Sequence, residues 1–170
     1  MDAVHFISDC LAQVHLRLVA TCNDLTQDQL LWRPAPTANN IGFILWHLAR
    51  HEDTRITETG SLGEDVWATG SWHEQFGQPV TAPDPGDRMG LRQLAIPSLE
   101  VLVGYAEEVH QRTSGYISGL SDNDLDQPPD PSQPENTRAG SLRHLIPHKN
   151  NHHGQIDYLR GLQDEEWDLP

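Results

Sequence analysis

Positive charge is scarce in this chain of 170 residues. The sequence holds 11 Lys and Arg against 25 Asp and Glu, which gives a formal net charge of −14. Lys149 is its single lysine. Binding to nucleic-acid phosphates needs clustered cations, and so does binding to anionic membrane surfaces. The composition therefore argues against nucleic acids and membranes as partners.

Cysteines and long apolar runs are scarce as well. Cys10 and Cys22 are the two cysteines, and both fall within one predicted helix, where a mutual disulfide is geometrically unfavourable. Such cysteine usage is typical of a reducing compartment. The apolar runs are too short for a transmembrane helix, and the first residues lack the charged and apolar regions of a signal peptide. We therefore expect a cytoplasmic protein.

Sustained two-residue alternation with β-branched residues is missing, which argues against strands. Apolar residues instead recur every three or four positions in several stretches, as on one face of a helix. The predicted long helices run from Asp2 to about Cys22, from a start within 37–40 to Gly60, within 89–120 with Pro97 marking a start or a kink, and from near Ser141 to about Leu162.

The segments between these helices differ in character. Thr26 and Gln29 form a capping-box pattern, which predicts a short helix. Residues 61–88 are rich in Gly, Pro and Asp, and such a long loop is often functional. Residues 121–136 are predicted to be a further loop. We expect one all-α domain over residues 1–163, a four-helix bundle, followed by an acidic tail at 164–170.

Histidine is abundant, with ten residues, and five of them fall on two predicted helices at helical spacing. The last helix carries histidines four residues apart, on one side with Leu145, Gln155 and Leu159, and the second helix carries a further pair. We expect the set on the last helix to face the bundle interior, the pair on the second helix to face inward or lie at the bundle edge, and His153 to point away to the surface. The two sets are His144, His148 and His152, and His47 and His51.

Two inward-facing sets of histidines can converge on one divalent metal ion. An unpaired buried imidazole is costly, and a metal resolves that cost. Three histidine ligands without a carboxylate leave coordination positions open, as in catalytic zinc sites, and nickel, iron or manganese could also bind. The alternative is a bundle whose histidines bond to carboxylates and backbone groups. The spacing does not choose the ligands among the five histidines.

Two motifs resemble those of the DinB-like superfamily of metal-binding four-helix bundles. They are residues 41–49 (IGFILWHLA) followed by Glu52, and residues 148–156 (HKNNHHGQI). Segments 25–34 and 72–77 also fit. The resemblance implies a bundle of up-down-down-up topology, with a long loop between its second and third helices. It also implies a divalent metal, most simply zinc or nickel, held by three histidines. These implied ligands are His47, His148 and His152.

One residue departs from a regular helix at this site. Pro147 directly precedes His148, inside the last predicted helix. It removes a backbone donor and crowds the carbonyl of Arg143, so we expect a kink that shifts His148 relative to His152.

The resemblance also implies an activity, because known members include metal-dependent thiol S-transferases and a mycothiol-dependent isomerase. Our first hypothesis is transfer of a low-molecular-weight thiol to a small electrophile, with thiolate formed at the metal. A metal-dependent hydrolase is the second hypothesis. The third is a metal-binding stress-response protein without turnover. Homodimers are common in the superfamily, so a homodimer is expected.

Further residues are assigned to the site as hypotheses. His144, His51 and Glu52 could move protons or orient ligands, although Glu52 could equally pair with Arg50 or Arg55 at the surface. The substrate pocket is predicted to include Arg55, Trp72 and Gln155. Each of these three also has a purely structural interpretation, as an ion pair, a packing anchor or a helix contact.

Overall fold

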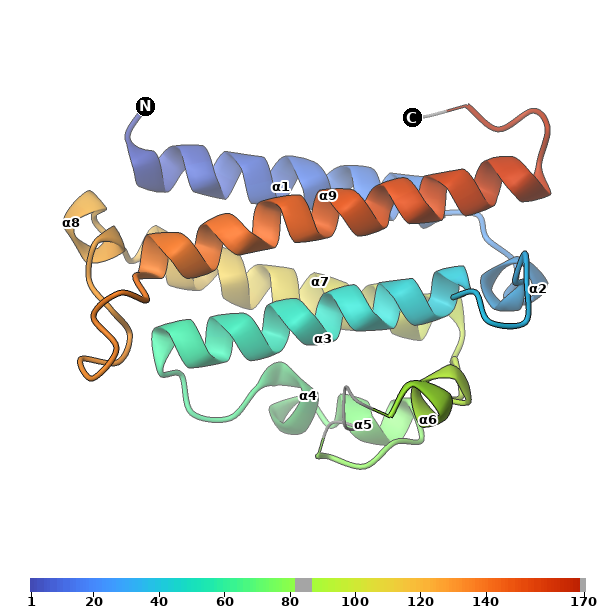
Figure 1. Ribbon diagram of the computed structural model, residues 1–170, viewed down its shortest axis with the longest axis horizontal. Helices are drawn as coiled ribbons and strands as arrows, with labels where there is room; N and C mark the ends of the chain where they lie inside the picture. Colours follow the sequence, from blue (N-terminus) through green and yellow to red (C-terminus); the bar gives the residue numbers. More distant parts are fainter. Residues whose placement is uncertain (82–86, 169–170) are drawn as a thin grey trace.

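The computed structural model describes residues 1–81 and 87–168, and this part of the chain is helical without any strand, as expected (Figure 1). The long helices are α1 (Ala3–Cys22), α3 (Ile41–Gly60), α7 (Leu99–Ser118) and α9 (Arg138–Gln163). The short ones are α2 (Gln27–Leu31), α4 (Val66–Thr69), α5 (Trp72–Gln75), α6 (Arg88–Arg92) and α8 (Asp122–Leu125).

Each long helix begins at a residue whose side chain accepts a hydrogen bond from a backbone N–H of the first turn. These N-caps are Asp2, Asn40, Ser98 and Thr137. Three of the four starts agree with the predicted ranges. The start of α9 lies before the predicted Ser141, because Thr137 caps the helix by accepting from the N–H of Gly140. The predicted capping box of Thr26 and Gln29 forms at α2.

The four long helices pack side by side, each in contact with two others: α1 with α7 and α9, and α3 with the same two. α1 and α9 run in one direction, and α3 and α7 run in the other (Figure 1). Their apolar faces meet in two clusters of buried residues. None of these helices, nor any other in the described ranges, is long and apolar enough to cross a membrane.

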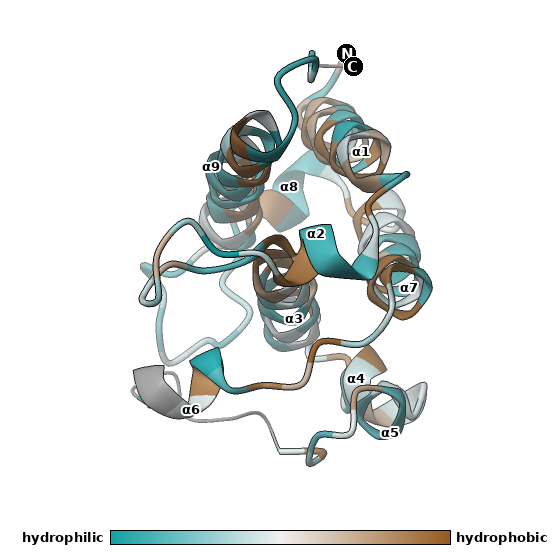
Figure 2. Cartoon of the chain, turned by 90° about the vertical axis from the view of Figure 1, so that its right-hand side faces the viewer, coloured by the Kyte–Doolittle hydropathy of each residue, from teal (hydrophilic) through white to brown (hydrophobic). Residues whose placement is uncertain are grey.

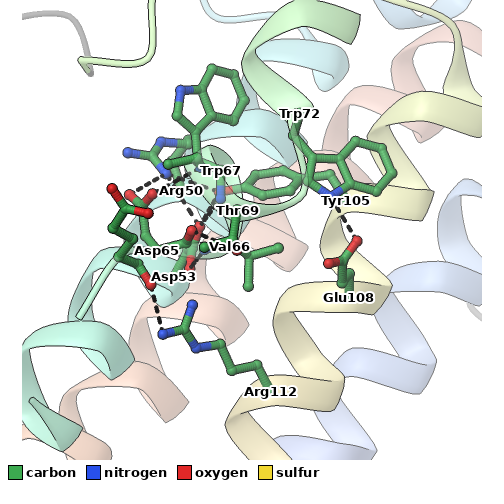
Figure 3. Close-up of polar contacts among 12 residues, drawn as sticks. Arg50, Asp53, Asp65, Val66, Trp67, Thr69, Trp72, Tyr105, Glu108 and Arg112 are labelled. Atoms are coloured by element: carbon green, nitrogen blue, oxygen red, sulfur yellow. Dashed lines mark hydrogen bonds and ion pairs between the residues drawn. The ribbon is translucent and has the colours of Figure 1, made fainter. Parts of the chain in front are cut away.

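The segment after α3 is anchored on α3 and α7 (Figures 2 and 3). The Asp53 carboxylate accepts hydrogen bonds from the backbone N–H groups of Val66 and Trp67, and from the Tyr105 hydroxyl. Arg50 donates to Asp53 and Asp65, which completes the network. The predicted loop thus contains helices α4 and α5, and part of it is a packed layer. Residues 82–86 of that predicted loop lie outside the described residues.

Candidate metal centre

Five histidines of α3 and α9 form a continuous row between the two helices. Their order is His152, His47, His148, His51 and His144, which we call the histidine row. The rings of His51 and His148 stand 4.0 Å apart between centroids, and those of His47 and His152 stand 4.9 Å apart. Because α3 and α9 are antiparallel neighbours, residues spaced by four on each helix meet in register.

Three members of the row can hold one ion. His47, His148 and His152 each offer a ring nitrogen, and these nitrogens all lie within 4.8 Å of one another. We call them the histidine triad. Nitrogens bound at about 2.1 Å to a tetrahedral zinc ion stand about 3.4 Å apart, so small rotations of the rings would complete the geometry. No other such group of ligands occurs within residues 1–81 and 87–168.

Unpartnered nitrogens support a metal at this position. Nδ1 of His148 and Nε2 of His51 are buried and have no hydrogen-bond partner among the described residues. Leaving such an atom without a partner costs free energy, and an ion held by the triad would recover this cost at His148, whereas His51 lies outside the triad. The donor set is purely imidazole, which suits zinc, nickel or another transition metal rather than calcium or magnesium. The residues present therefore fit a divalent transition-metal ion.

The protonation state of the row also suits a metal. Burial, followed by the neighbouring histidines, lowers the pKa of His148 to about 3. Burial and the nearby Arg55 lower the pKa of His51 to about 4, and burial and His152 lower the pKa of His47. These imidazoles are therefore neutral at pH 7, with one nitrogen lone pair each available to a ligand.

Gln155 orients the outermost triad member. Its side-chain oxygen lies 3.0 Å from Nδ1 of His152. Because an amide oxygen only accepts, the imidazole proton resides on Nδ1, and Nε2 is left free to bind a metal. Gln155 is exposed, as is His144 at the opposite end of the row. Both residues thus lie at the rim of the helix packing, not in its interior as expected from the stripe.

The expected effect of Pro147 on the site is small in the structure. α9 continues through Pro147 from Arg138 to Gln163. The rings of His148 and His152 stand 4.7 Å apart, and both belong to the triad. The proline costs the helix a backbone hydrogen bond without separating the two histidines.

Glu52 has neither of its two expected partners. It is buried, and its Oε2 lies 2.5 Å from Nζ of Lys149 on α9. Its other oxygen lies 3.9 Å from Nδ1 of His110, whose ring stacks on His15 at 4.0 Å between centroids. Burial alone would raise the pKa of Glu52, but Lys149 and the surrounding hydrogen bonds lower it. We call Glu52, Lys149, His110 and His15 the buried polar cluster.

The single lysine could have revealed this cluster. Long charged side chains are rarely buried unless they are paired, and Lys149 lies at helical spacing from the apolar residues Leu142, Leu145 and Ile156. His153 is also buried, and its Nε2 lies 2.7 Å from the Thr21 hydroxyl. The expectation that His153 lies at the surface is therefore wrong. α1 packs against α9 there and gives its side chain a partner.

The remaining predicted pocket residues lie in different places. Gln155 lines a hollow of about 400 Å³ next to His152. Arg55 lines a separate hollow of about 290 Å³, together with Glu58 and Asp130. Trp72 lies on α5, where it donates to Glu108 of α7 and packs against Tyr105 (Figure 3).

Comparison with known proteins agrees with this architecture. A crystal structure of a conserved protein from Enterococcus faecalis aligns with a TM-score of 0.81 and 23% sequence identity, over 95% of this chain and 97% of that one. This likeness concerns the fold. A search of curated proteins gave no significant match. The family model of the DinB superfamily matches residues 11–156, which include the whole histidine row. The chain therefore belongs to the DinB superfamily.

Proposed function

We propose that the chain is a divalent-metal-dependent thiol S-transferase, in which a small thiol attacks a small electrophile. The observation that carries this proposal is the histidine triad, with nitrogens within 4.8 Å of one another and an unpartnered nitrogen of His51 beside it. A metal bound by three imidazoles keeps open positions, and it would lower the pKa of a coordinated thiol. Zinc and nickel are the two metals that we propose for this imidazole donor set.

The chain's own residues have defined tasks in this proposal. His47, His148 and His152 hold the ion, and Gln155 keeps the proton of His152 on Nδ1. His51 is neutral at pH 7 and is placed against His148, so its free Nε2 can accept the proton that the thiol loses. The thiolate sulfur then forms a bond to the electrophilic carbon, the leaving group departs with its electron pair, and the thiol proton ends on His51 or in water.

The first test is metal content of protein purified without a histidine tag. We expect about one equivalent of metal in the wild type and none in His148→Ala. His5→Ala is the matched control, because His5 is exposed on α1 and lies outside the row. Circular dichroism confirms that both variants are folded. Absence of metal after incubation with zinc and with nickel would refute the proposal.

The second test is activity of the metal-loaded protein. A panel of small thiols is combined with a chromogenic aryl halide, and release of the coloured product is followed. We expect thiol-dependent turnover that is lost in His148→Ala and reduced in His51→Gln, with retained metal in the latter. Cleavage of an ester without thiol would favour the hydrolase instead. Bound metal without either reaction would favour a non-catalytic protein, and light scattering then tests the expected homodimer.

A further inference from the structure

A hollow that carries positive charge lies next to Gln155, which contacts His152 at one end of the histidine row. This hollow, of about 400 Å³, lies between the residues before α3, helix α6 and the second half of α9. Arg92 is the one charged residue among the described residues that line it, and Thr37, Asn39, Gln155 and Tyr158 add polar groups to the wall. No carboxylate is among these described lining residues, although the net charge of the chain is −14.

The Arg92 guanidinium is available to a ligand. It makes no hydrogen bond or ion pair with residues 1–81 or 87–168, and its side chain is half-buried. Arginine in such a setting binds carboxylates and other small anions through paired N–H groups. The opposite hollow differs, because Arg55 there shares the wall with Glu58 and Asp130, which would repel an anion.

A second arginine, Arg33, supports the wall of the hollow through hydrogen bonds to two backbone oxygens. Arg33 donates one hydrogen bond to the backbone oxygen of Ala38 and another to that of Arg92. It thus holds the segment before α3 against the end of α6, so the hollow is shaped by a bridging side chain. Its charge also adds to the positive potential of the same wall.

The hollow adjoins the triad, because two of its lining residues, Ile44 and Gln155, lie about one helical turn from His47 and His152. Gln155 also contacts Nδ1 of His152, so the hollow lies next to the outermost triad member. We infer that the hollow receives the anionic end of a small ligand at Arg92, with the ligand's other end directed to the histidine triad. The inference rests on the proposed function only in placing a thiol at that second end.

A pair of matched probes tests this inference. 3-Mercaptopropionate and its primary amide have the same size and the same thiol, and differ in charge at one end. Their binding is measured by ligand-observed NMR titration, with zinc-loaded protein and with protein in EDTA. Because a charged pair with arginine is strengthened by paired hydrogen bonds, we expect the carboxylate to bind about tenfold more tightly in both forms.

Two arginine variants supply the control. In Arg92→Gln we expect the preference for the carboxylate to disappear, while the amide binds as to the wild type. In Arg55→Gln, at the opposite hollow, we expect the preference to remain. Equal binding of both probes to the wild type, or an unchanged preference in Arg92→Gln, would overturn the inference.

Failure of the proposed function gives a different result. A protein that binds no metal and transfers no thiol would still show the carboxylate preference in EDTA. Conversely, thiol transfer without any carboxylate preference would leave the proposed function standing and remove this inference alone.

Discussion

Two groups of histidines flank α3, and they differ in what surrounds them. Both groups contain two buried ring nitrogens without a hydrogen-bond partner among the described residues: His51 Nε2 and His148 Nδ1 in the row, and His15 Nε2 and His110 Nδ1 in the buried polar cluster. In the histidine row, imidazoles face other imidazoles. In the buried polar cluster, His110 and His15 lie beside an ion pair of Glu52 and Lys149, with one charged or titratable group from each long helix. The row therefore consists of imidazoles that could share one metal ion, whereas the cluster already contains the ammonium group of Lys149. The same residue type is suited to metal binding in one place and to fold stability in the other.

The alternation along two helices explains this separation. His51 and Glu52 are neighbours on α3, and His148 and Lys149 are neighbours on α9. Successive residues of a helix point about 100° apart, so each pair sends one side chain to the row and one to the cluster. The ion pair of Glu52 and Lys149 thus lies beside the histidine row, on a neighbouring face of α3 and α9. It links the two helices that carry the triad.

The largest expected effect comes from breaking the ion pair. Lys149→Met leaves the buried Glu52 carboxylate without its cation, which should lower the free energy of unfolding by about 3–5 kcal/mol. Urea unfolding measures this loss. The double variant Glu52→Leu with Lys149→Met removes both charges and should recover most of the stability. A double variant as unstable as the single one would show that the pair is not the source.

Metal binding should distinguish the two groups sharply. His47→Ala removes a triad ligand and should reduce zinc affinity more than about 100-fold, because one of three bonds to the ion is lost. His110→Gln changes the cluster and should leave the zinc stoichiometry unchanged. Elemental analysis after dialysis against zinc compares the two variants. Equal metal content in both would contradict the separation of roles.

The pH dependence of folding stability should contain a contribution from His15 of the cluster, in addition to those of His47, His51 and His148 of the row. Burial, with Lys149 and His110 nearby, lowers the pKa of His15 from 6.5 to about 4. Between these values the unfolded chain binds a proton that the folded chain does not, so folding stability falls as the pH drops from about 6.5 to about 4. The contribution is about 1–3 kcal/mol.

This loss is measured by urea unfolding in EDTA between pH 7 and pH 5. We expect a shallower dependence in His15→Gln than in the wild type. The range stays above pH 5 because the lowered pKa of Glu52 makes its own contribution disappear only at more acidic pH. Glu107 also faces His15, and Glu107→Gln serves to separate its influence. Parallel curves for wild type and His15→Gln would show that His15 does not resist protonation.

The smallest expected effect is the change in zinc affinity when Gln155, at the edge of the histidine row, is replaced. Gln155→Ala frees Nδ1 of His152 and should lower zinc affinity about tenfold, because the ring loses the contact that fixes its tautomer. Competition with a chromogenic chelator measures the change. Asn151→Ala is the matched control, since Asn151 is exposed on the same helix. Similar affinities for the two variants would remove Gln155 from the site.

Much of the fold could be predicted because its signals are local. The caps Asp2 and Asn40, the capping box at Thr26 and the three-to-four residue spacing of apolar side chains each depend on a few neighbouring residues. The start of α9 was predicted near Ser141, a few residues after its observed start at Arg138, because a proline-rich segment precedes the helix and its first turn carries no clear apolar stripe.

The histidines of the site were identified by spacing, but their surroundings were not. The sequence shows that His148 and His152 share a face, yet it does not show that His153 meets Thr21 of α1. Nor does it show that Glu52 pairs with a lysine 97 positions away rather than with Arg50 or Arg55. Such pairings depend on which helices become neighbours, and helical periodicity carries no information on that choice.

The sequence by itself thus determined the helices, the abundance of histidine and the spacing that puts ligands on common faces, since these follow from the backbone geometry of single helices. The tertiary structure alone decided which nitrogens lack a partner, which carboxylate meets the lysine and which arginine faces an open hollow. These outcomes depend on the antiparallel packing of α3 and α9 and on the segments that surround them, where burial and charge come from residues far apart in the chain.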